Sequence, residues 1–196
     1  MAVNLNNCKF CDTQLYSFKE YESCDLLNYI QSSFNDSHFI SLTGGEPLVQ
    51  NDFLKEFLPL IKKAGFKIYL ETNATLPKAL RDIIDYVDII AMDFKFPSST
   101  GLKNFWLEHE EFLSIASQSE AFIKAVICNT TELSDLKRAV ELLSDFNRRI
   151  PFILQPNSYE FDRLLLDKIQ DFRRFAMEFL SDVRVIPQMH KLAGIK

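Results

Sequence analysis

Glycine, histidine and long apolar runs are scarce in this sequence, and each scarcity narrows what the chain can be. Only 5 of the 196 residues are glycine, so each is expected where the backbone needs its conformational freedom. The 3 histidines, His38, His109 and His190, lack the spacing of metal ligands. No leader sequence opens the chain, and no apolar run approaches the roughly 20 residues of a membrane span. We therefore expect neither export nor a membrane partner.

Clusters of basic residues are also missing. Lysine and arginine occur as short pairs at 62–63, 148–149 and 173–174, and the formal net charge is −5. Solvated pairs of this kind need no partner, and nothing in the sequence is similar to the basic, aromatic-rich stripe of a nucleic-acid binder. A small-molecule substrate is therefore expected, and a nucleic-acid partner is not.

Cysteine is sparse, and its spacing is informative. With 4 cysteines and no export signal, disulfides are not expected, and a reducing, cytoplasmic location is predicted. Cys24 and Cys128 stand alone, and we expect them to be surface or packing residues. Cys8 and Cys11 form a C-x-x-C pair, which makes them the candidate metal or redox site.

The remaining sequence alternates short β-rich runs with helical patterns, and no linker or repeat divides it. We predict one α/β domain over residues 1–196, because such alternation specifies parallel βαβ units. A short helix after Thr75 is expected, with Thr75 as its cap, and a partly helical stretch over 102–118. The predicted strands are 38–43, 66–70, 86–92, 121–127, 152–154 and 183–186, and the longer helices are about 25–34, 51–64, 132–146 and 161–180.

The C-x-x-C pair is compatible with several kinds of site. Thiolates two residues apart can share a zinc ion, form a redox pair or hold iron. Zinc usually needs a second pair of ligands, and none follows in the sequence. A thioredoxin-like site would follow a strand at a helix start, which is not predicted here. Two unpaired thiols are the remaining alternative.

Polar groups cluster where three predicted strands end. Gly44-Gly45-Glu46-Pro47 follows the first predicted strand, where two glycines let the backbone approach a bound molecule, although a plain turn is the alternative. Asp93 and Lys95 are two residues apart and share a face, either as catalytic groups or as a structural ion pair. Glu71 and Asn73 share a face by the same rule, although Asn73 also suits a turn.

Cys8-Lys9-Phe10-Cys11-Asp12-Thr13, followed by Gly44-Gly45-Glu46-Pro47, resembles the radical S-adenosylmethionine (radical SAM) superfamily. Within it, the chain is similar to the 7-carboxy-7-deazaguanine synthase family of queuosine biosynthesis. The similarity spans nearly the whole sequence, and its further segments are 71–73, 93–99, 155–156 and 187–194.

The resemblance implies a fold and a set of cofactors. It implies a partial (β/α)6-type barrel with a parallel sheet that lacks its first strand, because no strand is predicted before Cys8. It also implies a 4Fe–4S cluster on cysteine thiolates and S-adenosylmethionine on the open iron. The implied site residues are Cys8, Cys11 and the Mg²⁺ ligand Thr13; Gly44, Gly45, Glu46, Pro47, Glu71, Asn73, Gln155 and Pro156 for the cofactor; and Asp93 and Lys95 for catalysis.

The resemblance further implies a reaction and partners. The substrate would be a pterin, 6-carboxy-5,6,7,8-tetrahydropterin, converted to 7-carboxy-7-deazaguanine with loss of ammonia. An electron donor such as flavodoxin or ferredoxin would reduce the cluster, and the chain would form a homodimer. A second interpretation is an enzyme that activates a glycyl-radical partner, but the segment 93–99 argues against it.

One position departs from the pattern of the family. The family has a third cysteine four residues before the C-x-x-C pair, where this chain has Asn4. Three explanations compete: the chain starts late, Cys24 supplies the third thiolate, or the protein is a non-catalytic binding relative.

Overall fold

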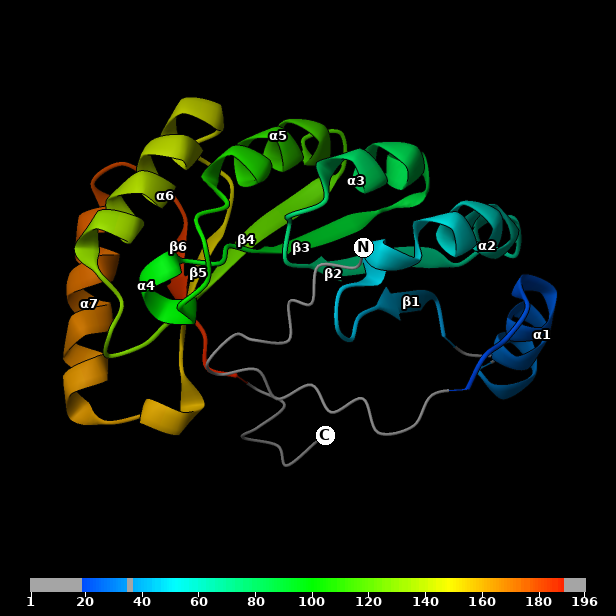
Figure 1. The fold of residues 1–196 in the computed structure, drawn as a ribbon, viewed down its shortest axis with the longest axis horizontal. Coiled ribbons are helices and arrows are strands. Elements are labelled where there is room, and N and C mark those ends of the chain that lie inside the picture. Colours follow the sequence, from blue (N-terminus) through cyan, green and yellow to red (C-terminus); the bar gives the residue numbers. More distant parts are fainter. Residues whose placement is uncertain (1–18, 35–36, 189–196) are drawn as a thin grey trace.

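The computed structural model describes residues 19–34 and 37–188, and its strands form one parallel sheet (Figure 1). Each strand is hydrogen-bonded to the next one in the sequence, and every such pair is parallel. The strands are β1 (Phe39–Leu42), β2 (Lys67–Thr72), β3 (Ile89–Asp93), β4 (Glu120–Ile127), β5 (Phe152–Pro156) and β6 (Val183–Val185). The predicted α/β fold is confirmed, and the open sheet is consistent with a partial barrel.

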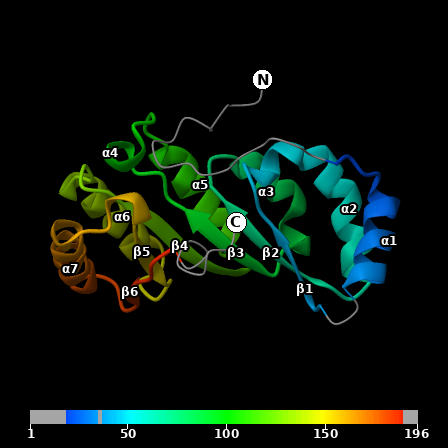
Figure 2. The same ribbon diagram turned by 90° about the horizontal axis from the view of Figure 1, so that it is seen from below.

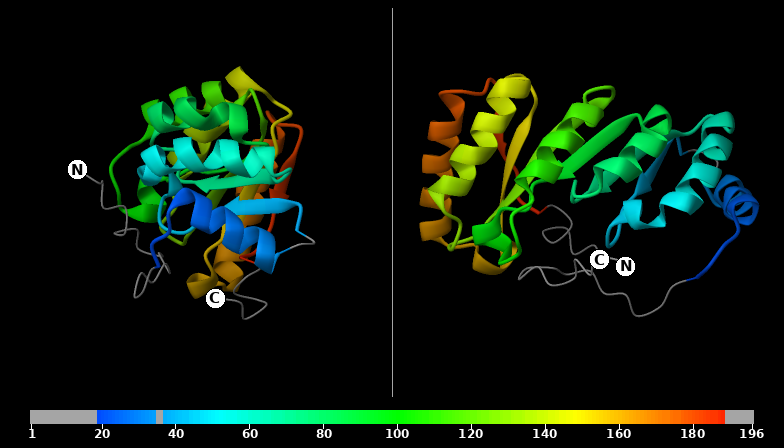
Figure 3. Two further views of the ribbon diagram at one scale, coloured as in Figure 1. Left: turned by 90° about the vertical axis from the view of Figure 1, so that its right-hand side faces the viewer. Right: turned by 45° about the horizontal axis from the view of Figure 1, so that its top comes forward.

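The longer helices that connect the strands follow one side of the sheet (Figures 1 and 3). Seen from the opposite side, the strands are not covered by any described helix (Figure 2). None of the helices in the described ranges has the length and apolar character needed to cross a membrane. The helices are α1 (Ser23–Ser33), α2 (Asn51–Lys63), α3 (Pro77–Ile83), α4 (Pro97–Thr100), α5 (Trp106–Ala116), α6 (Leu133–Phe146) and α7 (Arg163–Met177), with 3-10 turns η1 (Pro47–Gln50), η2 (Ile84–Tyr86) and η3 (Ser158–Glu160).

The two faces of the sheet differ in composition because side chains alternate along each strand. The face toward the helices is apolar, and its residues are buried: Ile68, Leu70, Ile90, Met92, Ile123, Ala125, Ile127, Phe152 and Leu154. The open face instead carries Glu71, Asp93 and Lys124, which are half-buried. Burying the apolar face against helices supplies the main stabilisation of this fold, and the charged side chains are thereby left on the open face.

Local sequence signals explain most element boundaries, with one correction. Helix α2 carries buried apolar residues at helical spacing and is followed by Gly65 at φ +90°, in the conformation that favours glycine. The predicted cap at Thr75 is wrong, because Leu76 is the N-cap of α3 and makes no side-chain cap bond. The Thr75 hydroxyl instead donates to Asn73 Oδ1 at 2.6 Å, so a turn before the helix takes the group that would have capped it.

The packing of α5 on the sheet gives a stability prediction. Phe112 is fully buried in α5, and Phe112→Ala is expected to lower the free energy of unfolding by about 3–5 kcal/mol because it leaves a cavity. Leu107 is in the same helix and 78% exposed, so Leu107→Ala should change it by less than about 0.5 kcal/mol. Urea denaturation of both variants measures the difference, and equal losses would contradict this packing.

Candidate active site

A glycine turn opens the candidate site directly after β1. Gly44 and Gly45 have φ of +85° and +40°, and a Cβ built on either glycine meets no atom within 4 Å. Positive φ explains why glycine is present at both positions. Both residues are exposed, so the peptide backbone of the turn is accessible to a bound molecule. Pro47 follows within the turn and is the first residue of η1.

The carboxylate of Glu46 fastens this turn to the end of β2. Its Oε1 accepts hydrogen bonds from the Leu48 N–H at 3.1 Å and the Thr72 hydroxyl at 2.8 Å. Its Oε2 accepts from the Asn73 N–H at 2.7 Å. Burial raises the pKa of Glu46, and these bonds, with Lys95 nearby, oppose that rise. Glu46 is only 7% exposed, so it holds the turn in place from within the protein.

Asn73 forms a tight turn beyond β2. Its Oδ1 accepts hydrogen bonds from the N–H and the hydroxyl of Thr75, at 3.0 and 2.6 Å, as an Asx turn does. Ala74, which follows, has φ +55° and is the one non-glycine residue with positive φ among the described residues. The prediction that Asn73 is a turn residue is therefore confirmed, and its contact with a cofactor stays a prediction.

Asp93 and Lys95 form an ion pair at the end of β3. Lys95 Nζ donates to Asp93 Oδ2 at 2.7 Å. The Lys95 side chain is only 17% exposed and the Asp93 side chain 24%. The other oxygen, Asp93 Oδ1, is buried and has no hydrogen-bond partner within the described part of the chain. A buried acceptor without a partner is costly in a folded protein, and it suits a donor on a bound molecule.

A second ion pair crosses the open face, and sequence reasoning missed one of its members. Lys124 Nζ on β4 donates to Glu71 Oε2 on β2 at 3.1 Å. In the register Glu71 lies opposite Ala91 of β3, whereas Lys124 lies opposite Asp93. The pair therefore crosses β3 diagonally, between Ala91 and Asp93. The available signal was a lysine inside an otherwise apolar strand.

The last residues of β5 also reach this end of the sheet. Gln155 is paired in register with Val126, two residues after Lys124, so Gln155 and Lys124 share the open face. Gln155 is half-buried and Pro156 is buried. The structure thus places polar groups from β1, β2, β3, β4 and β5 along one edge and face.

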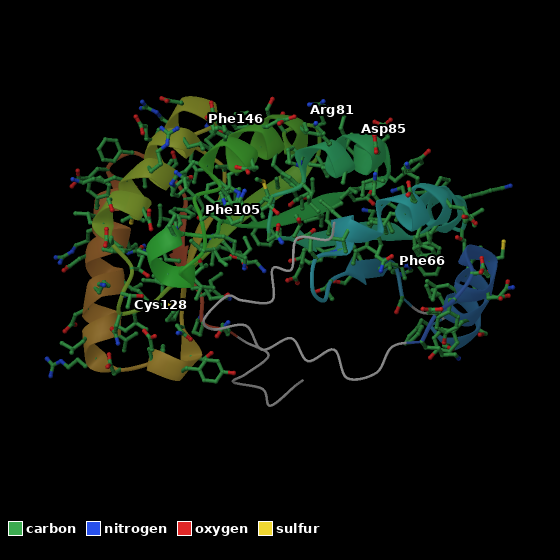
Figure 4. The ribbon with its side chains drawn as sticks, in the orientation of Figure 1. Phe66, Arg81, Asp85, Phe105, Cys128 and Phe146 are labelled. Atoms are coloured by element: carbon green, nitrogen blue, oxygen red, sulfur yellow. The ribbon has the colours of Figure 1, made fainter. Side chains whose placement is uncertain are left out.

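None of the three predicted metal ligands, Cys8, Cys11 and Thr13, is among the residues that the structure describes. Cys24 is exposed on α1, whereas Cys128 is buried just beyond the end of β4 (Figure 4). The Cys128 sulfur accepts a hydrogen bond from the Asn157 amide at 3.5 Å. The described residues contain no group of three His, Cys, Asp or Glu side chains that could hold a metal. Neither cysteine therefore has a described co-ligand.

His109 is a buried residue of this region that sequence reasoning left without a role. Its ring is fully buried, and this burial lowers its pKa to about 4. The available signal was its position: Phe105, His109, Phe112 and Ala116 fall on one stripe at helical spacing, so a histidine occupies an otherwise apolar helix face.

One hollow near these groups lies on the helix side of the sheet. It has a volume of about 690 Å³ and is lined mainly by residues of η1, α3 and α5. Glu46, Asp93 and Lys95 do not line it. We therefore place the candidate site at the strand ends and the open face, where the polar groups converge.

Known proteins are similar to this chain in sequence, and solved structures are similar to it in fold. Residues 5–105 match the Radical SAM superfamily. A 7-carboxy-7-deazaguanine synthase of Geobacter sulfurreducens is 41% identical over 157 residues, which cover 79% of this chain and 62% of that protein. One of Thermoplasma acidophilum is 31% identical over 192 residues, covering 94% and 81%. This chain therefore spans about three fifths of the length of the Geobacter relative.

Solved structures add a likeness of fold. Streptococcus suis SuiB bound to S-adenosylmethionine superimposes with a TM-score of 0.62 at 15% identity, covering 91% of this chain and 44% of that one. TYW1 with a lysine-pyruvate adduct superimposes with a TM-score of 0.55 at 16% identity, covering 82% and 60%. At these identities the likeness concerns the fold alone.

The buried ring of His109 predicts how stability depends on pH. Because burial lowers the folded-state pKa from 6.5 to about 4, the unfolded chain binds more protons between these values. Its contribution is complete above pH 6.5 and is lost as pH falls toward 4, by on the order of 3 kcal/mol. Urea unfolding from pH 7.5 to 4 should show a steeper fall for the wild type than for His109→Gln. His38→Gln, at an exposed histidine, should keep the wild-type slope; equal slopes for wild type and His109→Gln would contradict the prediction.

Proposed function

We propose a ring-contracting carbon–nitrogen lyase activity for this chain, which belongs to the radical SAM superfamily and, within it, to the 7-carboxy-7-deazaguanine synthase family. The proposed substrate is 6-carboxy-5,6,7,8-tetrahydropterin, and the proposed product is 7-carboxy-7-deazaguanine, formed with loss of ammonia. Relatives of that name match up to 97% of the chain. We treat residues 1–196 as one functional domain in this proposal.

The observation that carries the proposal is the set of polar groups at the ends of adjacent strands. An accessible glycine turn, a half-buried ammonium and a carboxylate oxygen with no partner among the described residues lie at the ends of β1 and β3. S-adenosylmethionine has an amine, a carboxylate and ribose hydroxyls, so it offers both donors and a negative charge. Asp93 Oδ1 is suited to accept a donor, and the Lys95 ammonium is suited to face a carboxylate. These residues therefore fit the cofactor of the superfamily, and we keep Asp93 and Lys95 as the proposed catalytic pair because there they would touch it.

The remaining predicted contacts are assigned by resemblance. Gly44, Gly45 and Pro47 would line the turn that receives the methionyl part, and Glu46 would hold that turn. Glu71 and Asn73 would line the cofactor side of β2, with Glu71 placed where cofactor and substrate meet, while Gln155 and Pro156 at the end of β5 would face the adenine. When bound to a 4Fe–4S cluster, this cofactor supplies the radical that removes a hydrogen atom from substrate.

Cys8 and Cys11 would hold two irons of the cluster, and we propose Cys24 for the third because the family position is occupied by Asn4. Thr13 would contribute an oxygen ligand to Mg²⁺, a hard cation that prefers oxygen. A flavodoxin or ferredoxin would be the electron donor. We also propose that two copies of this chain form a homodimer.

The open face supplies groups suited to a flat, charged substrate. Tyr69 and Phe122 lie on this face with ring centroids 6.3 Å apart, and burial raises the pKa of Tyr69 to about 12, so its phenol stays neutral. The Lys124–Glu71 pair offers an ammonium to a substrate carboxylate and a carboxylate to the N–H edge of a pterin. Aromatic and charged groups together match this class of substrate.

Iron content tests the cluster assignment. After anaerobic reconstitution, we expect about four irons per chain in the wild type and a loss of most of them in Cys8→Ala, Cys11→Ala and Cys24→Ala. Cys128→Ala is the matched control and should keep its iron, because Cys128 is buried beside Asn157. A full cluster in Cys24→Ala would refute the third-ligand assignment, and a colourless wild type would refute the enzymatic proposal.

Kinetics test the ion pair at the end of β3. Asp93→Asn and Lys95→Met are each expected to raise the KM for S-adenosylmethionine by roughly tenfold or more, since each removes one partner of a charged hydrogen bond. Lys62→Met is the control, because Lys62 pairs with Asp88 at 2.8 Å just before β3 begins, at the other end of this strand. Unchanged KM values in both β3 variants would show that the pair is structural.

A further inference from the structure

His109 connects the backbones at the ends of two neighbouring strands. Its Nδ1 lies 3.2 Å from the carbonyl oxygen of Ala74, just beyond β2. Its Nε2 accepts a hydrogen bond from the Lys95 N–H, just beyond β3, at 3.1 Å. The ring is fully buried within α5, so no water competes for either nitrogen. Both nitrogens are thus engaged by main-chain groups from different parts of the sheet.

These two partners determine the form of the ring. A backbone N–H can only donate, so Nε2 must be the unprotonated acceptor; a carbonyl can only accept, so Nδ1 must carry the proton. The ring is therefore neutral in its Nδ1–H form. Phe94 stacks on it at 4.6 Å with an interplanar angle of 14°, and Trp106 meets it edge-on at 6.0 Å. Phe105, which precedes α5 (Figure 4), lies on the same ring at 6.4 Å.

The contacts of His109 continue into the candidate site on both sides. Ala74 is bonded to Asn73, whose N–H donates to Glu46 at 2.7 Å. Lys95 carries the ammonium that pairs with Asp93. A continuous path of hydrogen bonds and single residues therefore runs from the glycine turn after β1, through the ring, to the ion pair after β3. Ala74 is held at φ +55° in the middle of this path, a conformation that needs support from its surroundings.

We infer that His109 is a positioning residue that fixes the Glu46 turn relative to the ammonium of Lys95. The inference rests on the proposed function in that these are the groups assigned to the cofactor. A neutral ring with one donor and one acceptor sets both strand ends at once, which an apolar side chain of the same shape cannot do. Protonation would place a second N–H against the Lys95 N–H and break the connection.

The charges around the ring come from two elements. Asp93 at the end of β3 and Lys95 just beyond it act on the ring from one side, and Glu108 belongs to the same helix as His109. From the β2 side the group in contact is the Ala74 carbonyl, which does not titrate. Because the pKa of His109 is about 4, changing the pH between 5.5 and 8 should leave the ring neutral.

Two substitutions separate hydrogen bonding from packing. His109→Phe keeps an aromatic ring against Phe94 but has neither nitrogen, whereas His109→Gln restores a donor and an acceptor on one planar group. Phe112→Leu, on the same buried helix face, is the control for a general loss of stability. Three readouts apply: the ¹⁵N chemical shifts of the His109 ring, amide exchange at Asn73, and S-adenosylmethionine affinity after anaerobic reconstitution.

We expect the Nδ1–H form in the wild type from pH 5.5 to 8. In His109→Phe, exchange at the Asn73 amide should accelerate and S-adenosylmethionine affinity should fall, each about tenfold. His109→Gln should stay within about threefold of the wild type, and Phe112→Leu should bind as the wild type does. The Asn73 amide bonds to Glu46 and not to the ring, so it reports positioning and not simply a lost contact.

Several results would overturn the inference. A charged ring or an Nε2–H form in the wild type excludes the hydrogen-bond arrangement, even if every variant fails to fold. Wild-type Asn73 exchange and cofactor affinity in His109→Phe would show that the ring only packs. If the wild type binds no S-adenosylmethionine but His109→Phe still loosens Asn73, the proposed function fails while the positioning role stands.

Discussion

The hydrogen bonds of the buried Glu46 carboxylate hold together the end of the sheet on which the site depends. Two N–H groups and one hydroxyl, from Leu48, Asn73 and Thr72, converge on its two oxygens. Hydrogen bonds to a charged group contribute roughly 1.5–3 kcal/mol each, which offsets part of the cost of burying the carboxylate, whose pKa stays raised. They extend the pairing of β1 with β2 by tying the glycine turn to the residues that end β2.

The two faces of the parallel sheet have different roles. One face is covered by helices and filled with apolar side chains, so it stabilises the fold. The other face has no described helix over it, and it can carry half-buried charges at modest cost because solvent reaches them. The Glu71–Lys124 pair is part of this arrangement, and it crosses β3 diagonally between Ala91 and Asp93. His109 connects the helix layer to the strand ends, because it belongs to α5 and bonds to the backbone just beyond β2 and β3.

Much of the fold could be predicted from the sequence, because its signals are local. Alternating apolar runs gave all six strands, and apolar residues at helical spacing gave the long helices. Boundaries were less accurate: the third strand begins at Ile89, later than predicted, because residues 84–86 form a 3-10 turn. The residue type of Thr75 predicts a helix cap, but in the structure its hydroxyl donates to Asn73 instead.

The site could be predicted only as a set of residue types at strand ends. The sequence placed Glu46 and Asp93 there, but it could not show that both oxygens of Glu46 are bonded while one oxygen of Asp93 is free of described partners. Lys124 and His109 were missed because their importance comes from partners 53 and 35 residues away. Contacts across such distances depend on strand register and helix docking, which no local pattern specifies.

Product formation is the most direct test of the proposed activity. The reconstituted chain should be incubated anaerobically with 6-carboxy-5,6,7,8-tetrahydropterin, S-adenosylmethionine, Mg²⁺ and a reductant, and the mixture analysed by mass spectrometry. We predict 7-carboxy-7-deazaguanine together with ammonia, dependent on both the cluster and S-adenosylmethionine. A cluster-loaded chain that binds S-adenosylmethionine but yields no deazapurine would contradict the proposed reaction.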